Sequence, residues 1–360
     1  MNLSIRTQAP KIHEFLPTTK TPEPTQNVDS GAALIRQLRD QKAEPDPQVL
    51  PRADSPTGDT YPGQIKPIWH TGTFHIPGTP VVIETLADAL AQLNGGKEVE
   101  LADPGLTDKH DELNNNDNPA DDIIFQDIDG EVIVDGASLT DIKQGAVGDC
   151  YFVAALASIA HHNPEYIENM ITDNGNGTYT VSFGGDLGDV TVDDDFATNS
   201  SGNSVYASTG SSSNPELWVA IVEKAYAQAN GSYETIEGGR ANEAIAEITG
   251  QDNFTVDHPS DFDPADLQTA LENGQSVTAS SLSSNDGKKT RTSDGFVTSH
   301  AYVVTDVQQN ASGEWEITVY NPWGSDSDTG DGTSDGFTTI SVEEFNTNFR
   351  SVQLLNEPVG

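Results

Sequence analysis

The chain has one cysteine, Cys150, and its surroundings are typical of a nucleophile. It begins an apolar run, CYFVAALASIA (150–160), which predicts a buried helix. At a helix N-terminus the free backbone N–H groups and the positive end of the dipole favour thiolate over thiol. A small buried hydrophobe is the alternative role for a lone cysteine. The preceding Gly145 and Gly148 favour the nucleophile, because they allow a tight loop whose amides converge on one point.

Gln144 and a histidine would complete the chemistry of such a cysteine. The Gln144 amide, six residues before Cys150, could form an oxyanion hole together with the backbone N–H of Cys150. A cysteine nucleophile also needs a histidine base. His300 opens the apolar segment HAYVVTDV, 150 residues after Cys150, which fits a base supplied by a second lobe. A strand-edge histidine with a satisfied hydrogen bond is the alternative. His161 would lie about 16 Å along the cysteine's own helix, so it is a poorer candidate.

Asn321 is the candidate for orienting the imidazole. It lies in YNPWG (320–324), after the strand that follows His300. An asparagine carbonyl can accept the imidazole N–H and hold one tautomer, and Trp323 could shield that bond from water. Taken alone, the segment reads as an Asn-Pro turn after a strand. The order of cysteine at a helix start, histidine on a strand and asparagine after the next strand favours a catalytic triad.

These segments resemble the active-site blocks of the calpain family of papain-like cysteine proteases. The resemblance rests on QGAVGDCYF, SHAYVVTDV and YNPWG, and on VTVDDDFATNSSG and PELWVAIVEKAYAQANGSYETIEGG between them. It covers about 130–350 and implies a calpain-like protein of bacterial type. It implies Cys150 as nucleophile, His300 as base, Asn321 as orienter and Gln144 in the oxyanion hole. It also implies that substrate pairs with the backbone of Gly238 and Gly239.

Two positions depart from the family's pattern. Tyr151 stands where tryptophan usually follows the cysteine, and Ser299 stands where glycine usually precedes the histidine. Both departures are mild, since Tyr151 is still aromatic and Ser299 is still small. The expected chemistry is therefore unchanged.

The resemblance further implies a calcium ion in each lobe. The positions matching the first-lobe ligands are the carbonyls of Val134 and Gly136 and the carboxylates of Asp141 and Glu216, a set of hard oxygens that suits Ca2+. The carboxylates could instead stabilise local structure, with Glu216 starting a helix. In the second lobe only Asp335 matches a family ligand. A solvated acidic loop is the favoured interpretation there, and its carboxylates are Asp326, Asp328, Asp331 and Asp335.

The elements around these motifs predict an α+β fold, a two-lobed papain-like core with a helical Cys lobe and a β-rich His/Asn lobe. An Asp129-Gly130 hairpin is expected within IIFQDIDGEVIVDG. The expected helices are 150–170, 216–230, 242–249 and one after Pro264, and the expected strands are within 177–196, SVTASSL, HAYVVTDV, WEITVYN and GFTTISV.

Composition divides the chain into four parts. Half of the 20 prolines lie at or before Pro67, so 1–64 is predicted to be a disordered N-terminal tail. We expect a poorly defined extension at 65–120, the Cys lobe at 121–260 and the His/Asn lobe at 261–360.

The charge of the chain, −40 in 360 residues, makes nucleic acids and anionic membranes improbable partners. No apolar run reaches the roughly 18 residues of a membrane span. No secretory leader is recognisable, which favours the cytoplasm and leaves export by an unrecognised route open. Protein or peptide substrates are the expected partners.

Together these features predict a cysteine endopeptidase that hydrolyses internal peptide bonds through an acyl-enzyme on Cys150, with calcium as its expected cofactor. Two alternatives are kept. One is a binding module on a calpain fold without turnover, and the other is an acyl transferase on a related scaffold.

Overall fold

The computed structural model describes residues 99–107, 123–211, 214–284, 290–326 and 333–360. It also gives the backbone of two paired short strands, β1 (Phe74–His75) and β2 (Val82–Ile83). The predicted tail at 1–64 lies outside the described residues. The chain divides into two compact units, Met1–Ala102 and Asp103–Gly360, and the candidate site belongs to the second. The boundaries proposed at 120/121 and 260/261 stay predictions.

Two consecutive helices, α3 (Cys150–His162) and α4 (Pro164–Met170), replace the single helix expected over 150–170. The break lies at Asn163, whose side chain accepts a hydrogen bond from the Tyr166 N–H and caps the second helix. Pro164 is the first residue of α4, where its missing N–H costs nothing. The apolar stretch of α3 is buried on all sides, as its composition predicts.

The next helices end at glycines, as expected. These are α5 (Trp218–Asn230), followed by Gly231, and α6 (Ala241–Thr249), followed by Gly250. Both glycines have positive φ, the left-handed conformation that closes a helix at little cost in glycine. The later helices are α7 (Pro264–Glu272) and α8 (Val342–Asn348), and two short 3-10 turns are η3 (Leu139–Asp141) and η4 (Pro259–Asp261).

The hairpin expected around Asp129-Gly130 is wrong. Its first half, β3 (Ile124–Asp127), pairs with β7 (Asp195–Thr198), and its second half makes only a bridge between Glu131 and Glu216. The pairing with the distant β7 forms a four-residue antiparallel ladder, which takes the place of the predicted local hairpin. The other short strands of this lobe are β4 (Ile171–Asp173), β5 (Thr178–Ser182), β6 (Asp189–Asp193), β8 (Gly210–Ser211) and β9 (Asn214–Pro215). The antiparallel strands expected within 177–196 are β5 and β6.

The second lobe is built on a six-stranded antiparallel sheet with the order β10-β15-β11-β12-β13-β14. The four strands expected from the sequence are present, and β10 and β15 were not expected. Their bounds are β10 (Phe254–Asp257), β11 (Gln275–Ser281), β12 (Ala301–Gln309), β13 (Trp315–Tyr320), β14 (Phe337–Ser341) and β15 (Phe349–Pro358).

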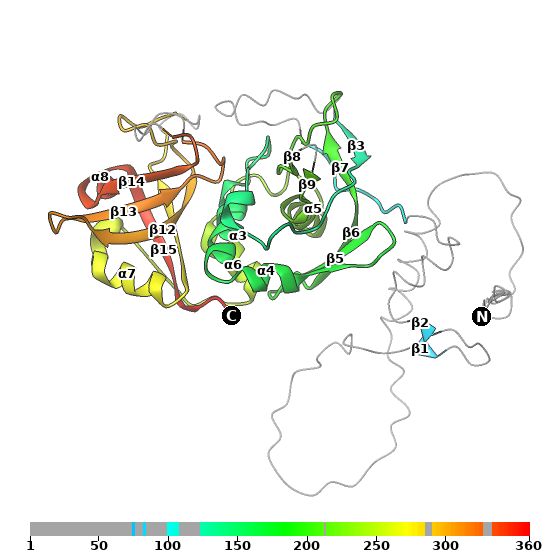
Figure 1. The fold of residues 1–360 in the computed structure, drawn as a ribbon, viewed down its shortest axis with the longest axis horizontal. Helices are drawn as coiled ribbons and strands as arrows, with labels where there is room; N and C mark the ends of the chain where they lie inside the picture. The colour runs from blue at the N-terminus through cyan, green and yellow to red at the C-terminus, as the bar shows by residue number, and fades with distance from the viewer. Residues whose placement is uncertain are drawn as a thin grey trace, which may run out of the picture. The chain divides into compact units, whose positions relative to one another are not determined.

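The sheet lies between α3 and α7 (Figure 1). Alternation along β12 explains this, because Ala301 and Val303 belong to the core around α3 whereas Tyr302 and Val304 belong to the core around α7. The helix of Cys150 therefore packs directly against the sheet that presents His300 and Asn321.

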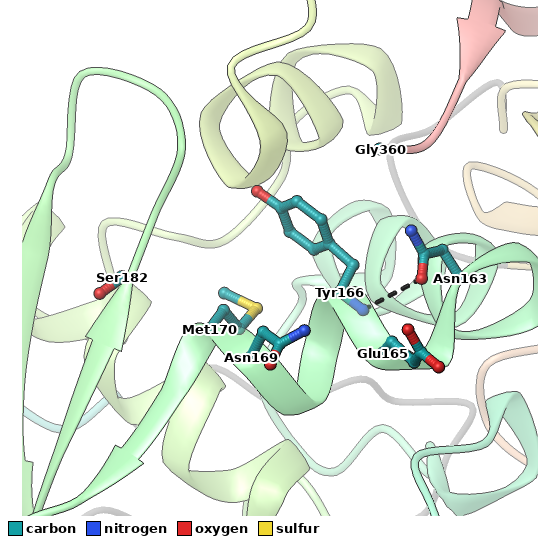
Figure 2. A pocket seen from close by; sticks show the side chains of 7 residues that line it. All are labelled: Asn163, Glu165, Tyr166, Asn169, Met170, Ser182 and Gly360. Atoms are coloured by element: carbon teal, nitrogen blue, oxygen red, sulfur yellow. Dashed lines mark hydrogen bonds between the residues drawn. The ribbon is translucent and has the colours of Figure 1, made fainter.

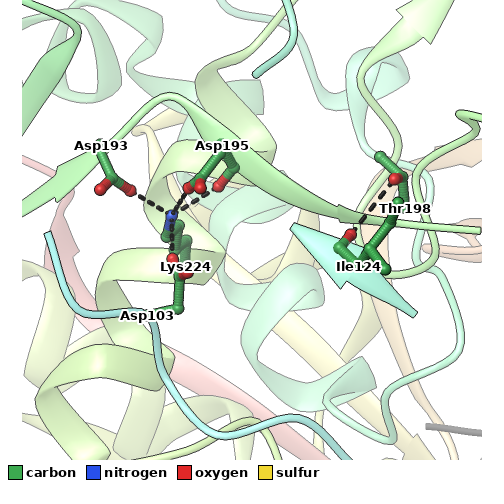
Figure 3. A network of polar contacts seen from close by, with 6 residues as sticks. All are labelled: Asp103, Ile124, Asp193, Asp195, Thr198 and Lys224. Carbon is green, nitrogen blue, oxygen red and sulfur yellow. Dashed lines mark hydrogen bonds and ion pairs between the residues drawn. The ribbon is translucent and has the colours of Figure 1, made fainter. Parts of the chain in front are cut away.

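A buried ammonium group ties three segments of the first lobe to the segment around Asp103 (Figure 3). Lys224 Nζ lies 2.7, 2.5 and 2.9 Å from carboxylate oxygens of Asp103, Asp193 and Asp195. Burial by itself would lower the pKa of Lys224, but the carboxylates, Asp193 first, outweigh it and raise the pKa. The three aspartates lie close enough together to hold a metal ion. Because the lysine supplies the cation at their centre, we interpret the cluster as structural.

Among the described residues, no helix combines the length and the apolar character needed to cross a membrane.

Candidate active site

His300 and Asn321 lie in hydrogen-bond contact, with 2.9 Å between His300 Nε2 and Asn321 Oδ1. His300 immediately precedes β12 and Asn321 immediately follows β13. Because these strands are antiparallel neighbours, the start of one lies beside the end of the other. Both side chains are buried. The structure therefore brings together the two residues that the sequence pairs.

Ser281, at the end of β11, fixes the backbone of His300. Its hydroxyl accepts the N–H of His300 at 3.0 Å, and its own N–H donates to the His300 carbonyl at 2.9 Å. Ser281 is buried. Sequence reasoning missed this residue, because nothing in SVTASSL distinguishes one serine from its neighbours before the pairing of β11 and β12 is known.

Aromatic rings surround the imidazole. The Trp323 ring centre is 5.0 Å from that of His300, and the backbone N–H of Trp323 donates to Asn321 Oδ1 at 3.1 Å. Tyr302 meets His300 edge-on at 5.1 Å. Burial raises the pKa of Tyr302, and Cys150 is among the groups that raise it further, so the cysteine also belongs to this neighbourhood. The tryptophan covers the pair as expected.

The loop before α3 holds Gln144 in a defined orientation. Its Nε2 donates to Val147 O at 2.9 Å and to Asp149 Oδ1 at 3.1 Å. Its backbone N–H donates to Pro322 O at 2.8 Å, which attaches the loop to the turn after Asn321. A Cβ on Gly145 would lie 2.0 Å from a backbone oxygen of Tyr206, so this position requires glycine for space.

Gly238 and Gly239 lie against the same region. The Gly238 N–H donates to Gly148 O at 2.9 Å, and Gly238 has a positive φ of 76°. A Cβ on Gly239 would approach the ring of Tyr151 to 2.5 Å. Tyr151 therefore packs against Gly239, and Gly238 contacts the cysteine's loop through Gly148.

The four residues matching the calcium ligands lie on neighbouring segments. Glu216 Oε1 accepts the Val134 N–H at 2.8 Å. Asp141 Oδ2 accepts the Ser138 N–H at 2.7 Å and the indole N–H of Trp218 at 3.1 Å. Contrary to expectation, Glu216 does not start a helix, because α5 begins at Trp218. Glu216 instead pairs with the loop at 131–134 through its backbone and its side chain, so it stays outside the helix.

The electrostatics of these carboxylates suit a cation. Burial raises the pKa of Glu216, and the charges of Asp141 and Asp135 raise it further. Burial also raises the pKa of Asp141. Gly136 and Asp135 both have positive φ, which turns this loop sharply. A hard divalent ion would offset the repulsion and accept oxygen ligands of this kind, so the residues present fit calcium.

Glu168 is a neighbour that the sequence did not reveal. It projects from α4, and its Oε1 accepts the Ala137 N–H at 3.4 Å. A Cβ on Gly136 would lie 3.3 Å from the same oxygen. Glu168 is 31 residues from Ala137 in the chain, so the sequence alone does not show that α4 brings the two together.

The acidic loop of the second lobe is only partly described, since Asp328 and Asp331 lie outside the described residues. Asp326 is buried and accepts the Gly336 N–H at 3.2 Å. The expectation that it belongs to a solvated loop is therefore wrong. Asp335 accepts the Phe337 N–H at 3.1 Å. Both carboxylates hold the turn that leads into β14.

Two further features lie away from Cys150. His161 Nε2 is 3.0 Å from Thr305 O, and burial lowers the pKa of the adjacent His162 to about 4, so this end of α3 faces the sheet.

A cavity of about 310 Å³ opens beside α4, lined by residues such as Tyr166, Met170 and Ser182 (Figure 2). None of the triad or glycine-pair residues lines this cavity.

Comparison with known proteins agrees with this geometry. The model of the calpain family cysteine protease domain matches residues 120–354. Calpain-9 of Mus musculus is 36% identical over 208 residues, covering 54% of this chain and 30% of its own. The calpain-2 catalytic subunit of Homo sapiens is 32% identical over 232 residues, covering 60% and 33%. The calpain-type cysteine protease DEK1 of Zea mays is 34% identical over 200 residues, covering 52% and 9%.

The matched part of the chain thus spans about a third or less of the length of these relatives. The match of the family domain nevertheless covers most of this chain and includes the cysteine, histidine and asparagine segments. With its helical Cys lobe and β-rich His/Asn lobe, this chain belongs to the calpain family of cysteine proteases.

Proposed function

We propose that this protein is a calpain-like endopeptidase that cleaves internal peptide bonds of protein or peptide substrates. The observation that carries the proposal is the 2.9 Å contact of His300 and Asn321 next to the helix that begins with Cys150. Helix N-terminus, imidazole and orienting amide are the three parts that a cysteine nucleophile requires. The bacterial type of calpain-like protein stays a prediction from the motifs.

The proposed reaction uses Cys150 as nucleophile and His300 as its base. Because Nε2 of His300 is engaged by Asn321, Nδ1 is the nitrogen that takes the thiol proton. The thiolate sulfur attacks the peptide carbonyl carbon, and the oxyanion is stabilised by the Cys150 N–H and the Gln144 amide. The imidazolium then gives its proton to the leaving amine as the C–N bond breaks. Water releases the acyl group from Cys150 with His300 again as base.

Gly238 and Gly239 are proposed to bind substrate in extended form. Their position against Tyr151 and Gly148 supports this role, because it lies along the cysteine's loop. A backbone without Cβ atoms allows a peptide strand to approach closely. Their contribution to substrate affinity would come from main-chain hydrogen bonds, which do not depend on the side chains of the substrate.

We also propose that calcium regulates the enzyme through Val134, Gly136, Asp141 and Glu216. When bound, the ion would supply positive charge between two carboxylates whose pKa values are raised without it. Asp141 lies in the turn that leads into Gln144, and Glu216 lies on the segment before α5. Joining the two segments would therefore restrict the oxyanion-hole loop, whose geometry sets the rate of the chemical step.

The test uses the fact that Cys150 is the only thiol of the chain. Purified protein with calcium should release new peptide N-termini from an unstructured protein, and a single iodoacetamide adduct at Cys150 should stop this release. Cys150→Ala and His300→Ala should abolish cleavage, whereas His161→Ala, at the far end of the same helix, should retain it. Excess EGTA should suppress wild-type cleavage.

Each alternative has its own outcome. Release of ammonia without new N-termini would show acyl-transferase activity in place of peptidase activity. Peptide binding without cleavage would indicate a binding module. Full cleavage by Cys150→Ala would refute the nucleophile. Undiminished cleavage in EGTA would refute the calcium regulation and leave the triad standing.

A further inference from the structure

Two carboxyl groups that the mechanism does not use are buried directly behind Cys150. Asp149 precedes the cysteine and is 0% exposed, and Glu223 of α5 is 1% exposed. The two carboxyl groups are neighbours, and the contact between them raises the pKa of Glu223. The Ala207 N–H donates to both oxygens of Glu223, at 2.9 and 3.1 Å. Two buried carboxylates in contact cannot both be ionised without a large cost, so the pair must share a proton.

The contacts place that proton on Glu223. Asp149 lies at the N-terminus of α3, where the dipole favours a negative charge, and it accepts a hydrogen bond from the Gln144 amide. Burial raises the pKa of Glu223 well above its ordinary value, and the charge of Asp149 raises it further. A protonated Glu223 can donate its O–H to Asp149 and still accept the Ala207 N–H.

The other titratable groups nearby do not supply a competing cation. Tyr233 is fully buried, and its pKa is raised by burial and then by Glu223. Tyr206 and Asp103 also raise the pKa of Tyr233. Lys224 follows Glu223 in the chain, but its ammonium group is directed to Asp103, Asp193 and Asp195. Tyr151 lies on the Asp149 side of the pair, and its pKa is raised by burial and further by the charge of Asp149. The groups near the pair are thus the phenols of Tyr151 and Tyr233 and the thiol of Cys150, and none of them neutralises a second negative charge at neutral pH.

The pair acts on the oxyanion hole through Gln144. The two hydrogens of Gln144 Nε2 are donated to Val147 O and to Asp149 Oδ1. These bonds set the plane of the amide before substrate arrives, so that a carbonyl oxygen entering the hole shares a hydrogen that is already oriented. Orientation in advance is what makes such donors effective.

We propose that Asp149 and Glu223 are positioning residues of the oxyanion hole, in which a protonated Glu223 fixes the Asp149 carboxylate and this carboxylate orients Gln144. The inference rests on the proposed peptidase function for its kinetic consequences. Its structural part, a proton held on Glu223 and an amide held by Asp149, can be tested without turnover.

The kinetic test compares Glu223→Gln with Glu223→Ala across pH. Glutamine copies the protonated acid, because its amide donates to Asp149 and its oxygen accepts the Ala207 N–H. Glu223→Gln should therefore rescue kcat and should move the alkaline loss of wild-type activity to higher pH. Glu223→Ala should lower kcat by about 10²-fold with little change in KM, the loss typical of a misplaced oxyanion donor. The control is Glu243→Gln, the same change at an exposed site on α6, which should leave the pH profile unchanged.

The second measurement follows the side-chain amide hydrogens of Gln144 by NMR in the Cys150→Ala background. These hydrogens should exchange slowly in that background and with Glu223→Gln, and at least tenfold faster with Glu223→Ala. If wild-type protein cleaves nothing while the exchange results hold, the peptidase proposal fails and the positioning pair stands. A Glu223→Gln variant that loses as much kcat as Glu223→Ala, or that leaves Gln144 unprotected, would overturn the inference.

Discussion

Ser299, the residue before His300, has a φ of 53°, a left-handed conformation that costs most side chains about 1–2 kcal/mol. The family's usual glycine avoids this cost. Serine is held there by its backbone N–H, which donates to Leu282 O at 2.7 Å, and by its hydroxyl, which accepts the Ser284 N–H at 3.0 Å. The departure that the sequence flagged as mild is therefore a local strain next to His300.

Two substitutions at this exposed position test the strain. Ser299→Gly should change the free energy of unfolding by less than about 1 kcal/mol, because relief of strain and greater freedom of the unfolded chain oppose each other. Ser299→Val should lower it by about 2 kcal/mol, since a β-branched residue tolerates positive φ poorly. Urea unfolding of both variants measures the difference. Equal stability of the valine and glycine variants would show that the conformation carries no strain.

The residues proposed to carry the chemistry were easier to predict than those that position them. Cys150, His300 and Asn321 are recognisable by type, order and spacing. Ser281 and Glu223 are not, because a serine in a strand and a glutamate in a helix are ordinary until packing buries them. Burial and partners belong to the tertiary structure, and a single sequence does not display them.

At the scale of elements, the positions proposed to bind calcium join the loop at 131–141 to the segment that leads into α5. Glu131 and Glu216 form a bridge, and the backbone N–H of Trp218 donates to Val132 O at 2.9 Å. The local hairpin predicted for this loop failed because the loop takes its partners from two distant segments. Patterns of hydrophobicity report an element's own period and say little about which element pairs with it.

Glu216→Gln is the prediction that belongs to this scale. Glutamine keeps the hydrogen bond from the Val134 N–H but removes a negative charge from the cluster, so calcium should bind more weakly. The calcium concentration for half-maximal peptidase activity should rise, and the calcium-induced increase in Tm should shrink. Glu243→Gln serves as the control for loss of one exposed charge. An unchanged calcium dependence in Glu216→Gln would remove this carboxylate from the ligand set.

At the scale of the whole molecule, the two-lobed α+β arrangement followed from the order of helical and strand patterns. The sheet is nevertheless wider than expected, because β15 lies between β10 and β11. Its residues do not alternate strictly between buried and exposed, which concealed a ten-residue strand. Such interior strands lack the simple period-2 pattern, since both faces contact other elements.

The net charge of −40 gives a prediction for the complete chain. Repulsion among like charges opposes the compact state, and salt screens it over about 10 Å at 0.1 M. The urea midpoint of unfolding should therefore rise between about 0.05 M and 0.5 M NaCl. Choline chloride should act equally if screening is the cause, and calcium chloride should act at lower concentration. A midpoint that falls with NaCl would show that attractive ion pairs dominate instead.

The hydrogen bond from Trp218 to Asp141 has an optical consequence. The indole is fully buried, and its N–H points at one of the carboxylates whose charge a calcium ion would offset. Light emission from tryptophan depends on the electric field along the ring. The chain thus carries a fluorophore, Trp218, beside its proposed regulatory site. Its emission wavelength should follow the charge on that site, whether or not substrate is present or cleaved.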